Sequence, residues 1–171
     1  MKIRTMTRCA LFTAAMAVCG WLSVPLGDIA VSLQTFGLFL TLGLLGGRMG
    51  FAVCLVYLSL GVVGVPVFTG FQAGLGVLLG PAGGYLWGFT AAALVYWVCE
   101  DRLPQWLGMI LGMTACYLCG TAWYYFTYAD SGLWAVVLKC VIPYIVPDAL
   151  KITLALTLAP NLKYKLIRYR V

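Results

Sequence analysis

The sequence predicts an all-α integral membrane protein with six transmembrane helices and both termini in the cytoplasm. The chain is 63% hydrophobic and only 9% charged, whereas a soluble domain carries about 25% charged residues. Its apolar stretches have the roughly 17–25 residues that a helix needs to cross a bilayer core of about 30 Å. Its basic residues collect at the ends of these stretches on one side. We therefore expect a single membrane domain over residues 1–171, embedded in a lipid bilayer.

The predicted spans follow one another with short connections. They cover residues 6–25, 30–47, 50–66, 83–99, 106–128 and 133–158. Sustained in/out alternation is absent, which favours helices over barrel strands. The first span follows a basic start that resembles a signal peptide, but no clear cleavage site precedes Trp21, so we expect it to be retained. The last span is the longest, which fits a tilted or broken helix.

Basic residues orient the bundle. If the N-terminus is cytoplasmic, nine of the eleven Lys and Arg residues fall on the cytoplasmic side. They are Lys2, Arg4, Arg8, Arg48, Arg102, Lys163, Lys165, Arg168 and Arg170. The outer loops contain Asp28 and Asp130 but no Lys or Arg. This is a positive-inside pattern for six spans.

The outer loop between the third and fourth spans, residues 67–82, is uncharged and contains four glycines and several large apolar residues. A solvated linker would be more polar, and irregular backbone at membrane depth is tolerated only around a cavity. We expect this glycine-rich loop to cover a cavity; the alternative is a compact surface loop packed on the bundle.

Asp148 and Lys151 are the most informative residues of the chain. Asp148 is the one acidic residue inside a predicted span, and Lys151 follows at i+3 on the same helical face. A charge at bilayer depth costs about 2.5–3.5 kcal/mol on insertion scales, so it faces a partner, a cavity or a substrate path. Pro143 and Pro147 interrupt the backbone just before the pair. The pair predicts a binding site, against the alternative of a polar contact that joins two helices.

Further polar and aromatic side chains are predicted near the same outer half. Gln34, Gln72, Tyr85 and Tyr144 converge with Asp148 on that side in the predicted topology. A few polar groups among apolar walls are typical of a small-ligand site. Lys139, closer to the outer end of the last span, is a candidate counter-charge for an anionic ligand, or a side chain that extends to the interface.

Several function classes are excluded or disfavoured. The sequence has no His and one isolated Cys116-x-x-Cys119 pair among seven scattered cysteines, so we expect no metal site and no cofactor. It lacks a nucleotide-binding Gly-x-x-x-x-Gly-Lys-Ser/Thr loop, so it cannot itself hydrolyse ATP. The net charge of +6 reflects topology and not binding to nucleic acid. An intramembrane enzyme or a structural adaptor are the alternatives to a binding protein.

Small residues recur at helical spacing. Ala10 and Ala14 lie one turn apart on the first span and Ala17 continues that face, while Gly84 and Gly88 repeat the pattern in the fourth. Such spacing lets helix backbones approach closely. We expect most of these positions to pack within the bundle and one of them to present a docking face to a partner.

Four sequence blocks then resemble a known family. They are Leu33-Gln34-Thr35-Phe36, Gly64-Val65-Pro66-Val67-Phe68, Gly80-Pro81-Ala82-Gly83-Gly84-Tyr85-Leu86-Trp87-Gly88-Phe89 and Pro147-Asp148-Ala149-Leu150-Lys151. Together they resemble the BioY family, the biotin-specific substrate-binding (S) components of energy-coupling-factor (ECF) transporters, over nearly the whole chain.

The resemblance implies high-affinity biotin binding and uptake at the plasma membrane of a prokaryote, without enzymatic activity of its own. It implies a transmembrane coupling subunit and ATPase subunits as partners, with Ala10 and Ala14 as the docking motif. Asp148 and Lys151 match the family's polar pair, which is expected to bind the ureido ring. The family also implies an Asn in the outer loop; the one asparagine here is Asn161, and Gln72 is the expected substitute.

Overall fold

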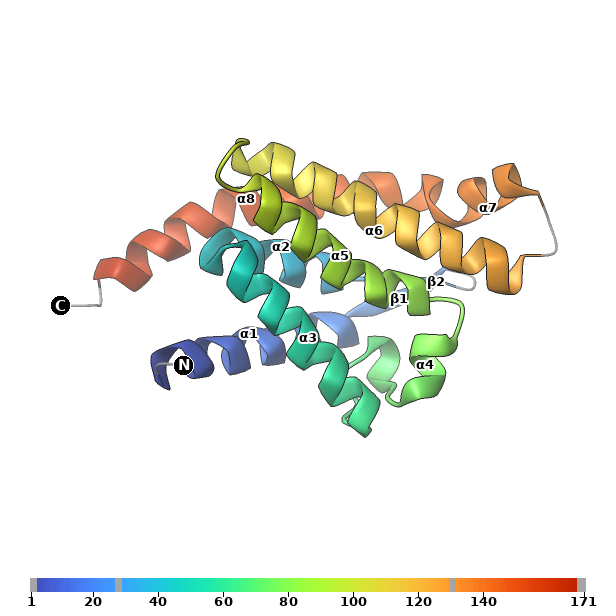
Figure 1. Ribbon diagram of the computed structural model, residues 1–171, viewed down its shortest axis with the longest axis horizontal. Helices are drawn as coiled ribbons and strands as arrows, with labels where there is room; N and C mark the ends of the chain where they lie inside the picture. The colour runs from blue at the N-terminus through green and yellow to red at the C-terminus, as the bar shows by residue number, and fades with distance from the viewer. Residues whose placement is uncertain (1–2, 27–28, 130–131, 169–171) are drawn as a thin grey trace.

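A computed structural model describes residues 3–26, 29–129 and 132–168, and it is largely helical (Figure 1). Its elements, in chain order, are α1 (Ile3–Trp21), β1 (Ser23–Leu26), β2 (Ile29–Ser32), α2 (Gln34–Leu45), α3 (Gly47–Val63), η1 (Thr69–Phe71), α4 (Leu75–Leu79), α5 (Gly83–Cys99), α6 (Gln105–Tyr128), α7 (Leu133–Cys140) and α8 (Ile142–Arg168).

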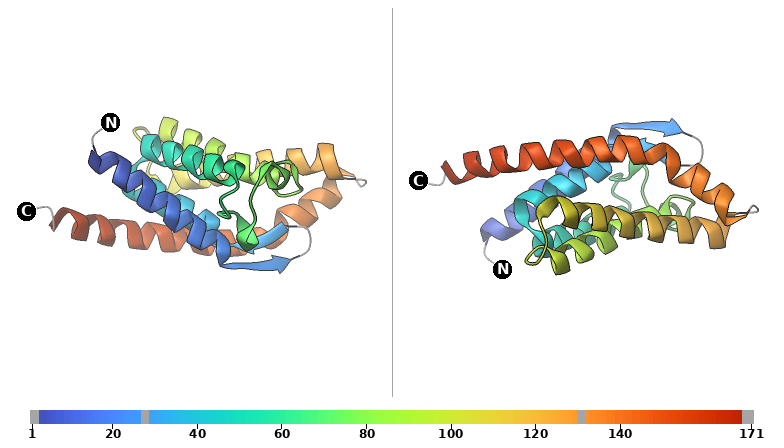
Figure 2. Two further views of the ribbon diagram at one scale, coloured as in Figure 1. Left: turned by 90° about the horizontal axis from the view of Figure 1, so that it is seen from below. Right: turned by 90° about the horizontal axis from the view of Figure 1, so that it is seen from above.

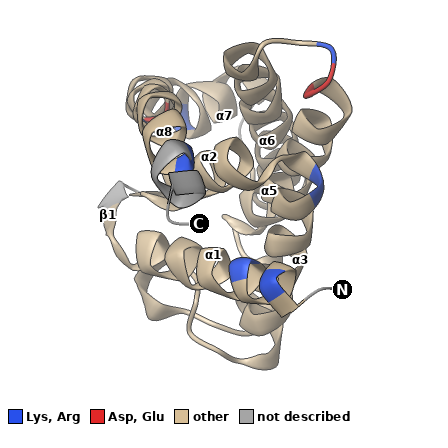
Figure 3. Cartoon of the chain, turned by 90° about the vertical axis from the view of Figure 1, so that its left-hand side faces the viewer, with Lys and Arg blue, Asp and Glu red and all other residues tan. Residues whose placement is uncertain are grey.

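The long helices run along one common direction, so the molecule has two distinct ends. The N-terminus and the C-terminal part of α8 lie at one end, which we call the terminal end, and β1, β2, α4 and α7 lie at the other, the hairpin end (Figure 1). Together α7 and α8 run the length of the bundle (Figure 2). Figure 3 views the terminal end, where the Lys and Arg segments of α1 lie.

The distribution of side chains is that of a bundle in an apolar solvent. Leu118, Val98 and Phe126 are 67%, 64% and 83% exposed, while Asp148 and Lys151 are buried. A soluble protein rarely exposes large contiguous apolar surfaces. Among the described residues, two helical stretches are long and apolar enough to cross a membrane, Gln105–Tyr128 and Leu133–Lys163; α2, α3 and α5 are shorter apolar helices.

A two-stranded hairpin replaces helix at the outer ends of the first two predicted spans. Strands β1 and β2 pair antiparallel, with Ser23 opposite Ser32 and Val24 opposite Val31. The prediction of continuous helix over residues 6–25 and 30–47 was therefore wrong at these ends. Short apolar runs rich in β-branched residues do not distinguish a strand from a buried helical segment by periodicity.

The loop predicted over residues 67–82 contains two short helical elements, η1 and α4. Phe68 anchors it, because its side chain is fully buried and packs where Gly61 leaves room: a Cβ on Gly61 would lie 2.0 Å from Phe68 Cζ. Phe68 also packs edge-on against the Tyr57 ring, with 5.6 Å between centroids. The loop is thus held on the bundle at its inner side.

Helices α5 and α6 pack closely through glycine. A Cβ on Gly84 would lie 2.3 Å from Trp123 Cβ, and one on Gly88 would lie 2.9 Å from Cys116 Sγ. These contacts confirm that this small-residue repeat serves packing within the bundle.

The last predicted span is two helices, as its length suggested. The break lies at Val141, whose φ of −121° and ψ of −55° end α7. Pro143 then falls in the first turn of α8, where its missing N–H costs nothing, and α8 continues through Pro147. The interruption lies two residues before Pro143, where a proline is expected to end the preceding helix, whereas Pro147 is accommodated within α8.

Candidate functional site

A cavity of ≈380 Å³ lies in the half of the bundle nearer the hairpin end. Residues from both strands, α2, the loop over residues 67–82 and the helices from α5 to α8 line it. These residues are Ser23, Ala30, Val31, Ser32, Gln34, Thr35, Phe68, Thr69, Gly70, Gln72, Val77, Ala82, Tyr85, Leu86, Phe89, Met113, Cys116, Tyr117, Cys140, Tyr144, Asp148 and Lys151. All six ligand-binding residues predicted from the sequence are among them.

The inner end of the cavity, which we define as Thr35, Tyr117, Asp148 and Lys151, is built on a buried ion pair. Lys151 Nζ lies 2.8 Å from Asp148 Oδ1, and the two residues are only 6% and 5% exposed. Their i,i+3 spacing on α8 places both side chains on one face. Since a lone buried charge is costly, each charge stabilises the other.

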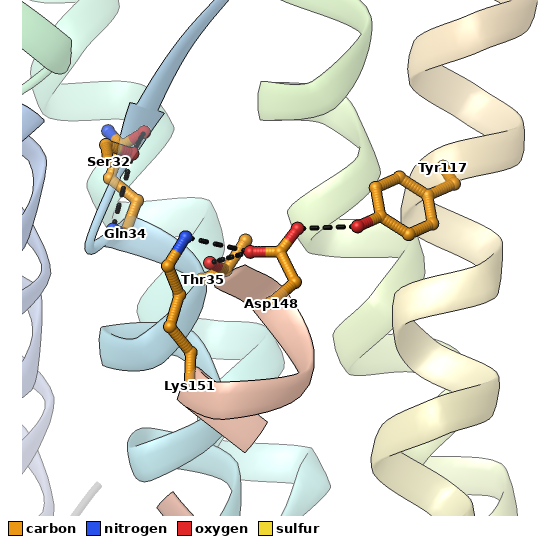
Figure 4. A network of polar contacts seen from close by, with 6 residues as sticks. All are labelled: Ser32, Gln34, Thr35, Tyr117, Asp148 and Lys151. Carbon is orange, nitrogen blue, oxygen red and sulfur yellow. Dashed lines mark hydrogen bonds and ion pairs between the residues drawn. The ribbon is translucent and has the colours of Figure 1, made fainter. Parts of the chain in front are cut away.

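Two hydroxyl groups complete the surroundings of the Asp148 carboxylate (Figure 4). Thr35 Oγ1 donates to Oδ1 at 2.9 Å, and the Tyr117 hydroxyl donates to Oδ2 at 2.6 Å. A carboxylate offers about four acceptor positions, so three donors leave about one. Lys151 has three N–H donors and uses one on Asp148. The pair therefore presents an acceptor and a donor side by side.

Neither Thr35 nor Tyr117 was among the residues predicted for the site. Thr35 follows Gln34 in the sequence block that resembles the BioY family, which is a signal that could have identified it. Tyr117 lies between Cys116 and Cys119 on α6 and carries no comparable signal, because its bond to Asp148 joins residues 31 positions apart.

Tyr117 and Asp148 also border a second cavity. This groove of ≈410 Å³ runs between α6 and α8 and is lined mainly by apolar residues, among them Ile110, Ile145 and Ile152. Met113, Tyr117 and Asp148 line both cavities. These three side chains thus form the partition between the first cavity and the side of the bundle.

Gln34 lines the first cavity but uses its amide to hold the surrounding chain. Its Oε1 accepts from Ser32 Oγ at 3.2 Å and from Thr69 Oγ1 at 3.0 Å. Its Nε2 donates to the Tyr57 hydroxyl at 2.5 Å, which in turn donates to the carbonyl of Val67 at 2.7 Å. The network connects α2, β2 and α3 to the loop over the cavity.

The remaining predicted residues occupy the walls and the mouth. The Tyr85 hydroxyl donates to the carbonyl of Cys140 at 3.0 Å, so it joins α5 to α7. Tyr144 is buried against Tyr124 and Val136 in a separate apolar cluster. Gln72 is exposed and belongs to the mouth, which we define as Ser23, Ser32, Thr69, Gly70 and Gln72.

Ala10 and Ala14 are exposed on α1, the helix that begins at the terminal end (Figure 1). Ala17, predicted on the same face, is buried at 5% exposure. The exposed small-residue stripe is therefore limited to the part of α1 nearer the terminal end.

Metal-ligating residues do not gather in the described part of the chain: no group of three or more Cys, Asp or Glu side chains could hold an ion. The cysteines in this part are free thiols.

Comparison with known proteins gives a consistent result. The model of the BioY family matches residues 1–168. The "Probable biotin transporter BioY" of Pyrococcus horikoshii is 33% identical over 95% of this chain and 98% of its own length. The "Biotin transporter BioY2" of Lactococcus lactis subsp. cremoris is 36% identical over 81% of this chain and 78% of its own. A crystal structure of "the S-component for biotin from an ECF-type ABC transporter" superposes with a TM-score of 0.82 at 25% identity, over 95% of this chain and 92% of that one.

Proposed function

The chain belongs to the BioY family, and from this premise we propose that it binds biotin as the S component of an ECF-type transporter in a prokaryotic plasma membrane. Its relatives are transporters, and the chain is a transport protein and not an enzyme. ATP hydrolysis then belongs to other subunits.

The observation that carries the proposal is the buried Asp148–Lys151 pair at the inner end of a largely apolar cavity. One edge of biotin's cyclic urea has an N–H donor next to a carbonyl acceptor. The free acceptor position of Asp148 matches that N–H, and the remaining donors of Lys151 match that carbonyl. Phe68, Leu86 and Phe89 line the same cavity and provide apolar surface for the thioether ring.

Biotin titration of the purified full-length chain tests this function. We expect a heat of binding in calorimetry and a rise in thermal stability, because a ligand of the folded state stabilises it by mass action. Desthiobiotin, which keeps the urea but lacks the sulfur ring, serves as a comparison for the apolar wall. Folded protein that shows neither heat nor stabilisation with biotin would contradict the proposal.

For the partner, we infer that the exposed stripe of Ala10 and Ala14 docks a helix of a transmembrane coupling subunit. Small side chains allow close backbone approach. The pair Ala10→Trp with Ala14→Trp should abolish uptake and co-purification of the coupling subunit, and biotin binding by the isolated chain should be unchanged. Undiminished uptake would exclude this docking face.

For topology, we propose six crossings with the terminal end in the cytoplasm and the hairpin end outside. The 12 residues of α2 rise about 18 Å, and four residues of β2 add about 13 Å, so helix and strand together reach across a bilayer core. Arg4 lies at the start of α1 and Arg48 at the start of α3, and both helices begin at the terminal end (Figure 1).

Asp28, Asp130, Lys2 and Arg170 lie outside the described residues, and for Lys165 only the backbone is described, so the labelling test uses neighbouring positions. In a background without native cysteines, a membrane-impermeant thiol reagent on intact cells should modify Gly132→Cys and spare Lys163→Cys. The opposite labelling pattern would reverse the orientation and move the site to the cytoplasmic face.

A further inference from the structure

The mouth of the cavity is polar but carries no cation. Among the residues that line the cavity, the charged ones are Asp148 and Lys151, and both are buried at its inner end. Of the eleven Lys and Arg residues, only Lys139 and Lys151 lie between residues 103 and 162. Segments 27–28 and 130–131, which follow β1 and precede α7, contain no basic residue either.

Lys139 is directed to another partner. Its Nζ donates to the Tyr124 hydroxyl at 3.1 Å and lies 5.6 Å from the centroid of that ring. Lys139 is exposed and is not among the residues that line the cavity, although the next residue, Cys140, is. It therefore does not supply the counter-charge that the sequence suggested for an anionic ligand.

Two hydroxyl donors of the mouth are used within the protein, and the side-chain donors that remain there, the Ser23 hydroxyl and the Gln72 amide, are neutral. Ser32 and Thr69 both donate to Gln34 Oε1, at 3.2 and 3.0 Å. Gly70 and Gln72 are exposed to the surroundings of the hairpin end. An anion placed here keeps its hydration and gains no charge-assisted hydrogen bond from a protein cation.

The two ends of a bound biotin therefore meet different surroundings. If the urea lies against Asp148 and Lys151, as proposed above, the aliphatic tail extends toward the mouth and its carboxylate lies there. We propose that this carboxylate contributes little to binding, and that the chain also accepts biotin whose carboxyl group is an amide, including alkyl amides and the lysyl amide. The inference rests on the proposed biotin function and specifies its substrate class: a free cyclic urea is required, and a free acid is not.

Competition binding to the purified full-length chain tests the inference, with biotin, biotin methylamide and biotinyl-lysine as ligands. We expect the dissociation constant of the methylamide to lie within about threefold of that of biotin, and that of the bulkier lysyl amide within about tenfold. A methylamide that binds 30-fold or more weakly than biotin would overturn the inference and leave the biotin function intact. If biotin itself does not bind, the proposed function fails, and the inference fails with it.

A substitution at Lys139 tests directly whether this residue binds the carboxylate. Lys139→Gln should leave the affinities for biotin and for the methylamide unchanged, as should the matched control Lys163→Gln at the other end of the bundle. A tenfold or larger loss that affects biotin but not the methylamide would identify Lys139 as a partner of the carboxylate and overturn the inference.

Discussion

The inner end and the mouth of the cavity use polar groups for different purposes. At the inner end, Thr35, Tyr117 and Lys151 all donate to one carboxylate, and the pair retains unused donors and an acceptor position. At the mouth, the hydroxyls of Ser32 and Thr69 are used on Gln34 and hold the loop in place.

This difference means that the inner end recognises the ligand, whereas the mouth shapes the entrance through which the ligand passes. Groups at the inner end are buried and charged, so a ligand that matches them forms strong hydrogen bonds, and one that does not leaves a buried charge uncompensated. Groups at the mouth are neutral, and two of them, Ser32 and Thr69, bond Gln34, so they shape the entrance and contribute little to the recognition of a ligand. Substitutions at the inner end should therefore change affinity most, and substitutions at the mouth should change it least.

The largest effect is expected from the ion pair itself. Asp148→Asn or Lys151→Met should each weaken biotin binding by more than 100-fold, because removal of one partner of a buried pair costs about 3–5 kcal/mol. Calorimetry gives the affinity, and thermal unfolding reports whether the bundle is intact. The double variant restores charge balance, so it should unfold at a higher temperature than either single variant and still fail to bind. Single variants with parental affinity would show that the pair only joins helices.

A smaller loss is expected from the hydroxyls that orient the carboxylate. Tyr117→Phe should weaken binding roughly tenfold or more, because a hydrogen bond to a charged group is worth about 1.5–3 kcal/mol and each 1.4 kcal/mol is about tenfold. Thr35→Val should weaken binding by a similar factor, because Thr35 donates to the other carboxylate oxygen, Asp148 Oδ1. Tyr125→Phe, on the same helix but not lining the cavity, is the matched control. Equal effects of the two tyrosine variants would mean that Tyr117 does not act through Asp148.

At the mouth, the expected loss is smaller again. Thr69→Val removes a neutral hydrogen bond to Gln34 worth about 1 kcal/mol, so affinity should fall roughly fivefold. The change should appear mainly as faster dissociation in a stopped-flow measurement, since the loop is then held less firmly. Thr114→Val is the control, because that hydroxyl bonds its own helix at Ile110. A loss as large as that of Tyr117→Phe would contradict the division between the two regions.

The smallest effect is expected where α1 contacts the loop. Trp21 Nε1 donates to the carbonyl of Pro66 at 2.8 Å, and its ring stacks on Phe71 with 4.8 Å between centroids. Trp21→Phe removes the hydrogen bond and retains an aromatic ring, so affinity should change by less than about threefold. Trp21→Ala, which also removes the stacking, should give the larger of the two changes in dissociation rate. The reverse order would show that stacking does not hold the loop.

Of the residues that line the cavity, the sequence singled out the charged pair and part of the walls, but not Thr35 and Tyr117, which bond the pair. Asp148 and Lys151 were recognisable because a charge in an apolar stretch stands out, and their i,i+3 spacing is a local property of a helix. Gln34, Gln72, Tyr85 and Tyr144 were predicted to lie near Asp148, and all four line the cavity. For Gln34, the sequence did not reveal that its amide holds the loop through Thr69 and Tyr57.

By itself the sequence determined the helical class, the apolar exterior and the face that Asp148 and Lys151 share, because composition and the helical period act over one or two turns. Tertiary structure alone decided that β1 (Ser23–Leu26) pairs with β2 (Ile29–Ser32) and that Ala17 is buried. It also decided that Thr35 meets a carboxylate 113 positions away. Such contacts depend on how α2, α6 and α8 pack around one cavity, and no local periodicity encodes that arrangement.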